Sequence, residues 1–155
     1  MKNTIRRTTL GTIYFALLLA ALAPAGHAAT CSTATVAGHW GFTLTGTLLP
    51  STGPVLGAAT GRVTADADGN VSGTESRSVG GSYANETASG KWTVRPDCTG
   101  TLHIKFYESG QLVRTSVTSI VFDNNATEFR MVQKSLTLPD GTKVPVVVTV
   151  DGKKQ

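Results

Sequence analysis

The sequence predicts an all-β domain, an eight-stranded antiparallel up-and-down barrel. Apolar and polar residues alternate with a period of two through most of the chain from residue 39 onwards, which is the pattern of strands with one buried and one solvated face. Short turns rich in Gly, Pro, Asn and Asp separate these stretches, and strands joined in this way usually pair with each other. The sequence after residue 28 has no helical period of adequate length, so strands are the expected elements.

The first three strands are expected at 39–49, 56–66 and 71–79. In the first of them Trp40, Phe42 and Leu44 lie on one face and alternate with glycine and threonine. The second consists mainly of small residues, which indicates a tight bend or a close backbone approach.

Strands at 82–95 and 101–107 form the expected central hairpin around a turn at Pro96–Gly100. Trp92 is on the apolar face of the first arm, and Phe106 is on that of the second. Both arms have a polar opposite face, so the hairpin has one wet side.

The last three strands are expected at 111–122, 127–138 and 144–150. The first of these is rich in β-branched residues, which favour a pleated surface. The last contains Pro145, which is tolerated near the start of a strand or on an edge.

Eight strands joined by short turns can remove their exposed edges by closing into a barrel. Such a barrel has an interior that side chains fill or that holds one small ligand. A β-sandwich is the alternative. A Greek key needs at least one long connection, and the longest one here, about Pro50–Val55, is short for that purpose.

Residues 1–28 are expected to be a signal peptide. Three basic residues precede an apolar run over 13–23, and small residues precede the expected cleavage after Ala28. The run is shorter than the roughly 20 residues of a membrane-spanning helix. The mature chain is therefore expected to be one domain over 29–155, secreted or periplasmic, without membrane insertion. Cleavage lowers the formal net charge from +4 to +1, which indicates no nucleic-acid partner.

The two cysteines, Cys31 and Cys98, are expected to form one disulfide in an exported chain. Two free thiols or a metal-binding pair are the alternatives, but the sequence has no histidine and cysteine spacing that supports a metal. Asp66, Asp68 and Asn70 are similar to the start of a calcium loop, yet the downstream Glu is missing. No metal or cofactor is predicted.

The third strand decides whether charge enters the barrel. Val71, Glu75, Arg77 and Val79 share one face of this strand, and serine and threonine occupy the other. If the valines face inward, Glu75 and Arg77 enter the lumen, where a charged pair is costly unless it is hydrogen-bonded or grips a ligand. If the hydroxyl face is inside, the two residues form an ordinary solvated pair on the exterior.

Tyr83 and Arg130 are the further candidates for ligand contact, whereas no catalytic residue is predicted. His103 is expected at the surface, because it shares the wet face of its strand with Lys105 and Tyr107, and His39 is expected near the end of the barrel. Neither histidine has a serine and an acid at a spacing that indicates a catalytic triad.

The segments GHWGFTLTG, GRVTADADGNVSGTES and GKWTVRPDCTGTLHIKF, with a short basic tail at the end of the chain, carry a resemblance to known proteins. The chain resembles small secreted bacterial β-barrel proteins of uncharacterised function, which are similar to the calycin and allene-oxide-cyclase-like barrels. The resemblance implies a lumen used for a lipophilic ligand or, in the cyclase-like members, for steering a reactive substrate. It assigns no catalytic residue to a position of this chain.

Three functions follow as hypotheses. The first is a barrel that binds a small, largely apolar molecule, with Glu75, Arg77, Tyr83 and Arg130 orienting its polar end. The second is a structural or interaction module with a filled core. The third is a cyclase-like or isomerase-like enzyme. The sequence determines neither the ligand nor the oligomeric state.

Overall fold

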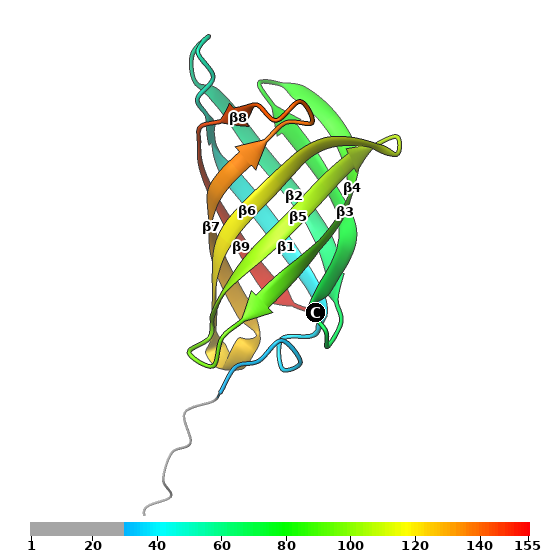
Figure 1. Ribbon diagram of the computed structural model, residues 1–155, viewed down its shortest axis with the longest axis vertical. Helices are drawn as coiled ribbons and strands as arrows, with labels where there is room; N and C mark the ends of the chain where they lie inside the picture. Colours follow the sequence, from blue (N-terminus) through cyan, green and yellow to red (C-terminus); the bar gives the residue numbers. More distant parts are fainter. Residues whose placement is uncertain (1–29) are drawn as a thin grey trace, which may run out of the picture.

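Eight long strands close into an antiparallel barrel, as Figure 1 shows. The computed structural model describes residues 30–155; the expected signal peptide and its cleavage site lie outside the described residues. The strands are β1 (Gly38–Leu48), β2 (Val55–Ala65), β3 (Asn70–Val79), β4 (Ser82–Val94), β5 (Thr99–Glu108), β6 (Gln111–Asp123), β7 (Glu128–Thr137), β8 (Lys143–Val144) and β9 (Val146–Lys154). A 3₁₀ turn, η2 (Asn124–Ala126), connects β6 and β7.

The strands follow one another around the barrel in chain order. From β1 to β7 each strand pairs with the next, and β9 pairs with both β7 and β1 to close the sheet. All of these pairings are antiparallel. The predicted up-and-down barrel is therefore confirmed, and the sandwich alternative is wrong.

The last predicted strand differs from the observed one at both ends. Pro145 interrupts it, because proline has no backbone N–H for the ladder, and the short β8 before it pairs only with β7. After the proline, β9 runs to Lys154. The basic residues that we expected as a tail thus belong to the strand, where Lys154 Nζ donates a hydrogen bond to the carbonyl oxygen of Thr35 at 3.3 Å.

The small residues of β2 allow close approach, as the sequence predicts. A Cβ added to Gly61 would lie 2.7 Å from the ring of Phe42 and would collide with the carbonyl oxygen of Thr74. Because only glycine avoids this overlap, the sheet can curve tightly here.

One end of the barrel is filled by aromatic rings. Trp40, Trp92, Phe122 and Phe129 form a cluster whose ring centroids are 5.2 to 6.2 Å apart, and most of the pairs have the edge-to-face geometry that aromatic rings prefer. Trp40 is fully buried and its Nε1 donates to the carbonyl oxygen of Val36 at 3.0 Å.

The segment before β1 covers this aromatic end. Val36, which belongs to this segment, is fully buried. The disulfide between Cys31 and Cys98 ties the segment to the turn between β4 and β5. Residues 30–37 and the last residue of the chain both lie at this end (Figure 1). We call it the closed end. The opposite end carries the β1–β2, β3–β4, β5–β6 and β7–β8 connections, and we call it the open end.

No helix within the described residues is both long enough and apolar enough to cross a membrane.

Removing the disulfide is expected to lower the free energy of unfolding substantially. The bridged residues are 67 positions apart, and for a loop of that size the chain-entropy treatment gives an upper figure of about 4 kcal/mol. Guanidinium unfolding of a Cys31→Ser, Cys98→Ser double variant measures the loss. The reduced wild-type chain is the control and should unfold at the same midpoint as the variant. An unchanged midpoint in both would contradict the prediction.

Candidate functional site

A layer of charged side chains lies inside the barrel, between the aromatic cluster and the open end. The apolar face of β3 points inward, because Val71 and Glu75 are 2% and 3% exposed. The structure thus decides between the two orientations of this strand that the sequence leaves open. Glu75 pairs in register with Glu86 of β4, and this second carboxylate also points inward and is 3% exposed.

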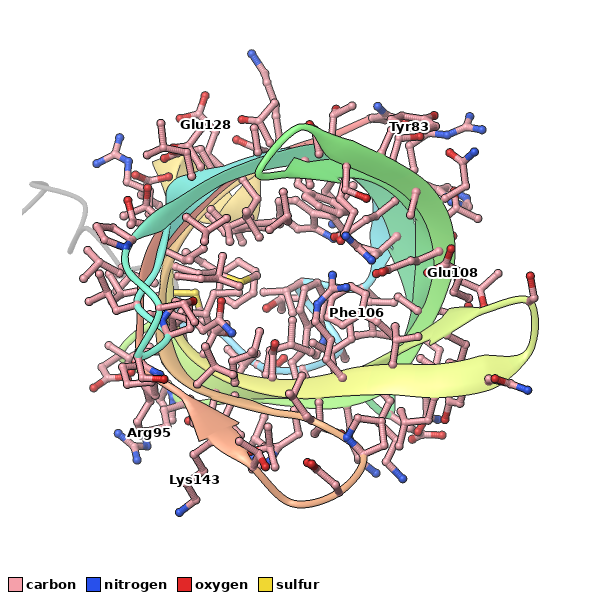
Figure 2. All side chains as sticks on the ribbon, turned by 90° about the horizontal axis from the view of Figure 1, so that it is seen from above. Tyr83, Arg95, Phe106, Glu108, Glu128 and Lys143 are labelled. Carbon is pink, nitrogen blue, oxygen red and sulfur yellow. A yellow bond between two sulfur atoms is a disulfide. The ribbon has the colours of Figure 1, made fainter. Side chains whose placement is uncertain are left out.

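Arg114 of β6 joins these two carboxylates. Its Nη2 donates to Glu75 Oε1, and its Nη1 donates to Glu86 Oε2. The guanidinium carbon also lies 3.9 Å from the centre of the Phe106 ring, a distance typical of cation–π contact. Phe106 points into the interior in Figure 2. Arg114 is therefore held by two charge-assisted hydrogen bonds and one ring face.

Arg77 extends the network toward the open end. Its Nε donates to Glu86 Oε1, and its Nη2 lies 3.6 Å from Glu108 Oε2. Both oxygens of Glu86 are thus occupied by guanidinium groups. The ion pairs of Glu75 and Arg77 are both made with residues of other strands. Glu75 pairs with Arg114 of β6, and Arg77 pairs with Glu86 of β4.

Arg114 points inward because it alternates in phase with the buried residues of β6, among them Ile120 and Phe122. A β-bulge lies directly beside it. The register between β5 and β6 shifts after Phe106, so that Phe106 opposes Arg114 and Tyr107 opposes Leu112. Val113 is the extra residue, and both Val113 and Arg114 line the interior cavity. The bulge thus brings Val113 to the cavity as well, without breaking the rest of the ladder.

A second bulge lies between β6 and β7, beside an amide side chain that points inward in phase with Phe129 and Met131. Lys134 is the extra residue there, and Gln133 opposes Thr118. Gln133 Nε2 donates to Ser116 Oγ at 2.9 Å and to the carbonyl oxygen of Ser135 at 3.2 Å. The interior at this depth is therefore polar on β6 and β7 as well as on β3 and β4.

The charged layer forms the floor of a cavity of about 190 Å³ toward the open end. Apolar side chains make up most of its wall, and the polar ones are Glu75, Arg77, Arg114 and Gln133. A smaller space of about 60 Å³ lies between this layer and the aromatic cluster. Leu44, Glu75, Arg114 and Gln133 line both spaces, so these residues separate the upper cavity from the deeper one.

Glu75 is the electrostatically unusual member of the layer. Burial raises the pKa of the Glu75 carboxyl above its ordinary value of 4.5, the Arg114 guanidinium opposes this shift, and the Glu86 carboxylate adds to it. Its Oε1 accepts from Arg114, but its buried Oε2 has no hydrogen-bond partner. A buried acceptor without a donor is costly, and a bound molecule that carries a donor would satisfy it.

The other two residues predicted for ligand contact lie outside the barrel. Tyr83 is 66% exposed and points away from the lumen in Figure 2, where its hydroxyl donates to Asn85 Oδ1 at 2.8 Å. The Arg130 side chain is 71% exposed and pairs with Asp123 at 3.3 Å. A molecule in the interior cavity meets neither side chain.

Sequence reasoning missed Glu86, Arg114 and Gln133. Glu86 had a usable signal, because it alternates in phase with Ala84 and Ala88, which are small residues on the face of β4 that points inward. Arg114 and Gln133 had the same signal, because Arg114 alternates in phase with Ile120 and Phe122, and Gln133 with Phe129 and Met131. In β6 the valines on the opposite face obscured it. His103 is exposed, as expected, and His39 is exposed as well.

The segment Asp66–Asn70, which is similar to the start of a calcium loop, is a turn in which the Asp66 carboxylate accepts hydrogen bonds from the protein itself. Asp66 Oδ1 accepts from the backbone N–H of Asp68 at 3.0 Å and of Asn70 at 2.8 Å, and Oδ2 accepts from Asn70 Nδ2 at 2.8 Å. These hydrogen bonds, those from Asn70 most of all, hold the pKa of Asp66 below its usual value. Asp66 therefore acts as the turn residue of the β2–β3 hairpin.

Comparison with known proteins supports the fold. No family model matches the chain, and no curated protein matches it. Among solved structures, a redesigned β-barrel, mFAP1, bound to DFHBI is 17% identical with a TM-score of 0.50, over 80% of this chain and 98% of that one. Another redesigned β-barrel is 17% identical with a TM-score of 0.50, over 83% and 99% of the two chains. At this identity the likeness shows the barrel alone, and the resemblance to calycin-like barrels stays a prediction.

Replacing Arg114 by Met should destabilise the barrel. The change leaves the buried Glu75 without its guanidinium and Glu86 with one instead of two, and breaking a buried ion pair on one side costs about 3–5 kcal/mol. Urea unfolding measures the loss. Arg130→Met is the matched control, because its exposed ion pairs are worth less than about 1 kcal/mol. Equal losses of unfolding free energy in the two variants would show that the buried ion pairs of Arg114 stabilise the barrel no more than the exposed ion pairs of Arg130.

Glu75 should make its own contribution to the pH dependence of stability. Since its folded pKa is raised, this contribution is fully present below the ordinary value of 4.5 and is lost as the pH rises through the folded pKa. The difference in unfolding free energy between wild type and Glu75→Gln, measured by urea unfolding at a series of pH values, should decrease with rising pH. A difference that grows with pH would contradict the assignment. Asp66, Asp97 and Asp140, whose pKa values are lowered, act in the opposite sense and cancel in this comparison.

Proposed function

We propose that the protein is a secreted or periplasmic barrel that binds one small, largely apolar molecule in the cavity at its open end. The observation that carries the proposal is the cavity of about 190 Å³ with apolar walls and a floor of buried charged groups. An apolar pocket with a few convergent polar groups is the usual form of a small-molecule site.

The size of the cavity limits its occupant. Pockets for drug-sized ligands have volumes of roughly 300–1,000 Å³, whereas an apolar cavity of about 150 Å³ binds benzene. A cavity of about 190 Å³ therefore suits a molecule with a single ring or a short chain. A long lipid chain would require side chains at the open end to move outward.

The polar floor gives the occupant an orientation. Of the four predicted contact residues, Glu75 and Arg77 line the cavity and are the ones we propose as ligand contacts, with Arg114 added. The apolar part of the molecule would lie toward the open end, among Leu48, Val79, Leu138 and Val146.

Export is supported by the cysteines. A disulfide joins Cys31 to Cys98, and disulfides persist mainly in oxidising compartments. Together with the expected signal peptide over 1–28, this favours a location outside the cytoplasm.

A filled-core interaction module is the second candidate, and one surface feature favours it. Leu56 and Val147 are 75% and 66% exposed, and both lie opposite Thr47 of β1 in the sheet register. Two large apolar side chains thus flank one residue on the outer wall near the open end, and exposed apolar groups of this kind can contact another protein.

Filling the cavity should abolish binding. Ala59→Phe places a ring in the cavity, and we expect titration calorimetry with toluene to show binding to wild type and none to this variant. The control is Thr60→Phe, at the next residue of β2, which is exposed and does not line the cavity. Native mass spectrometry of the mature protein, purified from its natural host without reductant, should also show one bound small molecule. An empty barrel that does not bind toluene would favour the interaction module.

A further inference from the structure

The unsatisfied acceptor at the cavity floor indicates the chemistry of the occupant. Within residues 30–155, three buried side-chain polar atoms have no hydrogen-bond partner: Glu75 Oε2, Trp92 Nε1 and Asp123 Oδ1. Of these three residues, Glu75 lines both the upper cavity and the deeper space, Trp92 lines the deeper space, and Asp123 lines neither. The Glu75 side chain is 1% exposed, so bulk water does not satisfy this oxygen.

The positive charges near Glu75 are already matched. Arg114 donates to both Glu75 and Glu86, and Arg77 donates to Glu86 and lies beside Glu108. Within the buried layer the two guanidinium groups therefore already have two carboxylate partners, Glu75 and Glu86, and Glu108, whose side chain is 46% exposed, adds a third at the edge of the network. An anionic ligand would find no unpaired positive charge here, and burying it without a cation of its own is costly.

We propose that the occupant is a small apolar molecule that carries a hydrogen-bond donor, with a protonated amine as the best match, and that this donor binds Glu75 Oε2. The inference rests on the proposed function and narrows its ligand class. An ammonium group would supply the missing donor and form a charge-assisted hydrogen bond, which is stronger than a neutral one. A hydroxyl would supply the donor alone, and a carboxylate neither.

The test compares four probes that share one ring: toluene, benzyl alcohol, benzylamine and benzoate. Each is titrated calorimetrically into the wild-type protein at pH 7, with the disulfide intact. We expect benzylamine to bind most tightly, at least about tenfold more tightly than benzoate, with benzyl alcohol next and toluene weaker. Benzoate that binds as tightly as benzylamine, while toluene also binds, would overturn this inference and leave the apolar site standing. Failure of all four probes to bind would overturn both this inference and the proposed ligand-binding function.

Two matched variants test whether the preference for benzylamine depends on Glu75 Oε2. Glu75→Gln keeps the shape of the side chain and removes its charge, and it should reduce benzylamine affinity about tenfold while leaving toluene affinity within about twofold. Glu86→Gln makes the same change in an equally buried residue, whose two oxygens are already occupied by Arg77 and Arg114. It should keep the order of the four probes.

Equal loss of the amine preference in both variants would show that the net charge of the network, and not Glu75 Oε2, selects the ligand, and would overturn the assignment. Circular dichroism and urea unfolding show whether each variant folds. If Glu75→Gln does not fold, the benzylamine to benzoate ratio on the wild type still decides the ligand class.

Discussion

Closure of the sheet is the constraint on which the rest of the structure depends. Because β9 pairs with both β1 and β7, the main ladder has no open edge, and the diameter of the interior follows from the number and tilt of the strands. Side chains must then fill a space of fixed width. At the closed end four aromatic rings do so, whereas toward the open end smaller residues leave a cavity.

The charged layer is tolerated because nearly all of its polar atoms have partners. Burial of a carboxylate or a guanidinium is unfavourable unless each charge is paired and hydrogen-bonded. Here each arginine reaches two carboxylates, and Phe106 covers one face of the Arg114 guanidinium. The remaining deficit is confined to one oxygen of Glu75. In the proposed function, that one atom would give the apolar cavity a chemical preference, which a fully apolar or fully paired interior would lack.

Much of the fold could be predicted from the sequence, but little of the site could. Alternation and turn composition are local properties, so they located all eight main strands to within a few residues and identified their order. The orientation of β3 could not be determined in this way, because both of its faces carry polar residues. Arg114 and Gln133 follow the alternation of their strands. The ion pairs that Arg114 makes with Glu75 and Glu86 could not be predicted, because they depend on how strands distant in the sequence face each other across the closed barrel. Tyr83 and Arg130 were selected for their residue type, and their strands turn them to the solvent.

The position of the chain ends affects how the protein can be handled. Residue 155 lies at the closed end, hydrogen-bonded through its backbone N–H to the carbonyl oxygen of His39 at 2.9 Å, and the segment from residue 30 lies at the same end (Figure 1). A linker joined to Gln155 therefore leaves the barrel on the side away from the cavity. Protein coupled to a bead or a sensor chip through this residue would present its mouth to the solution, with the aromatic end toward the support.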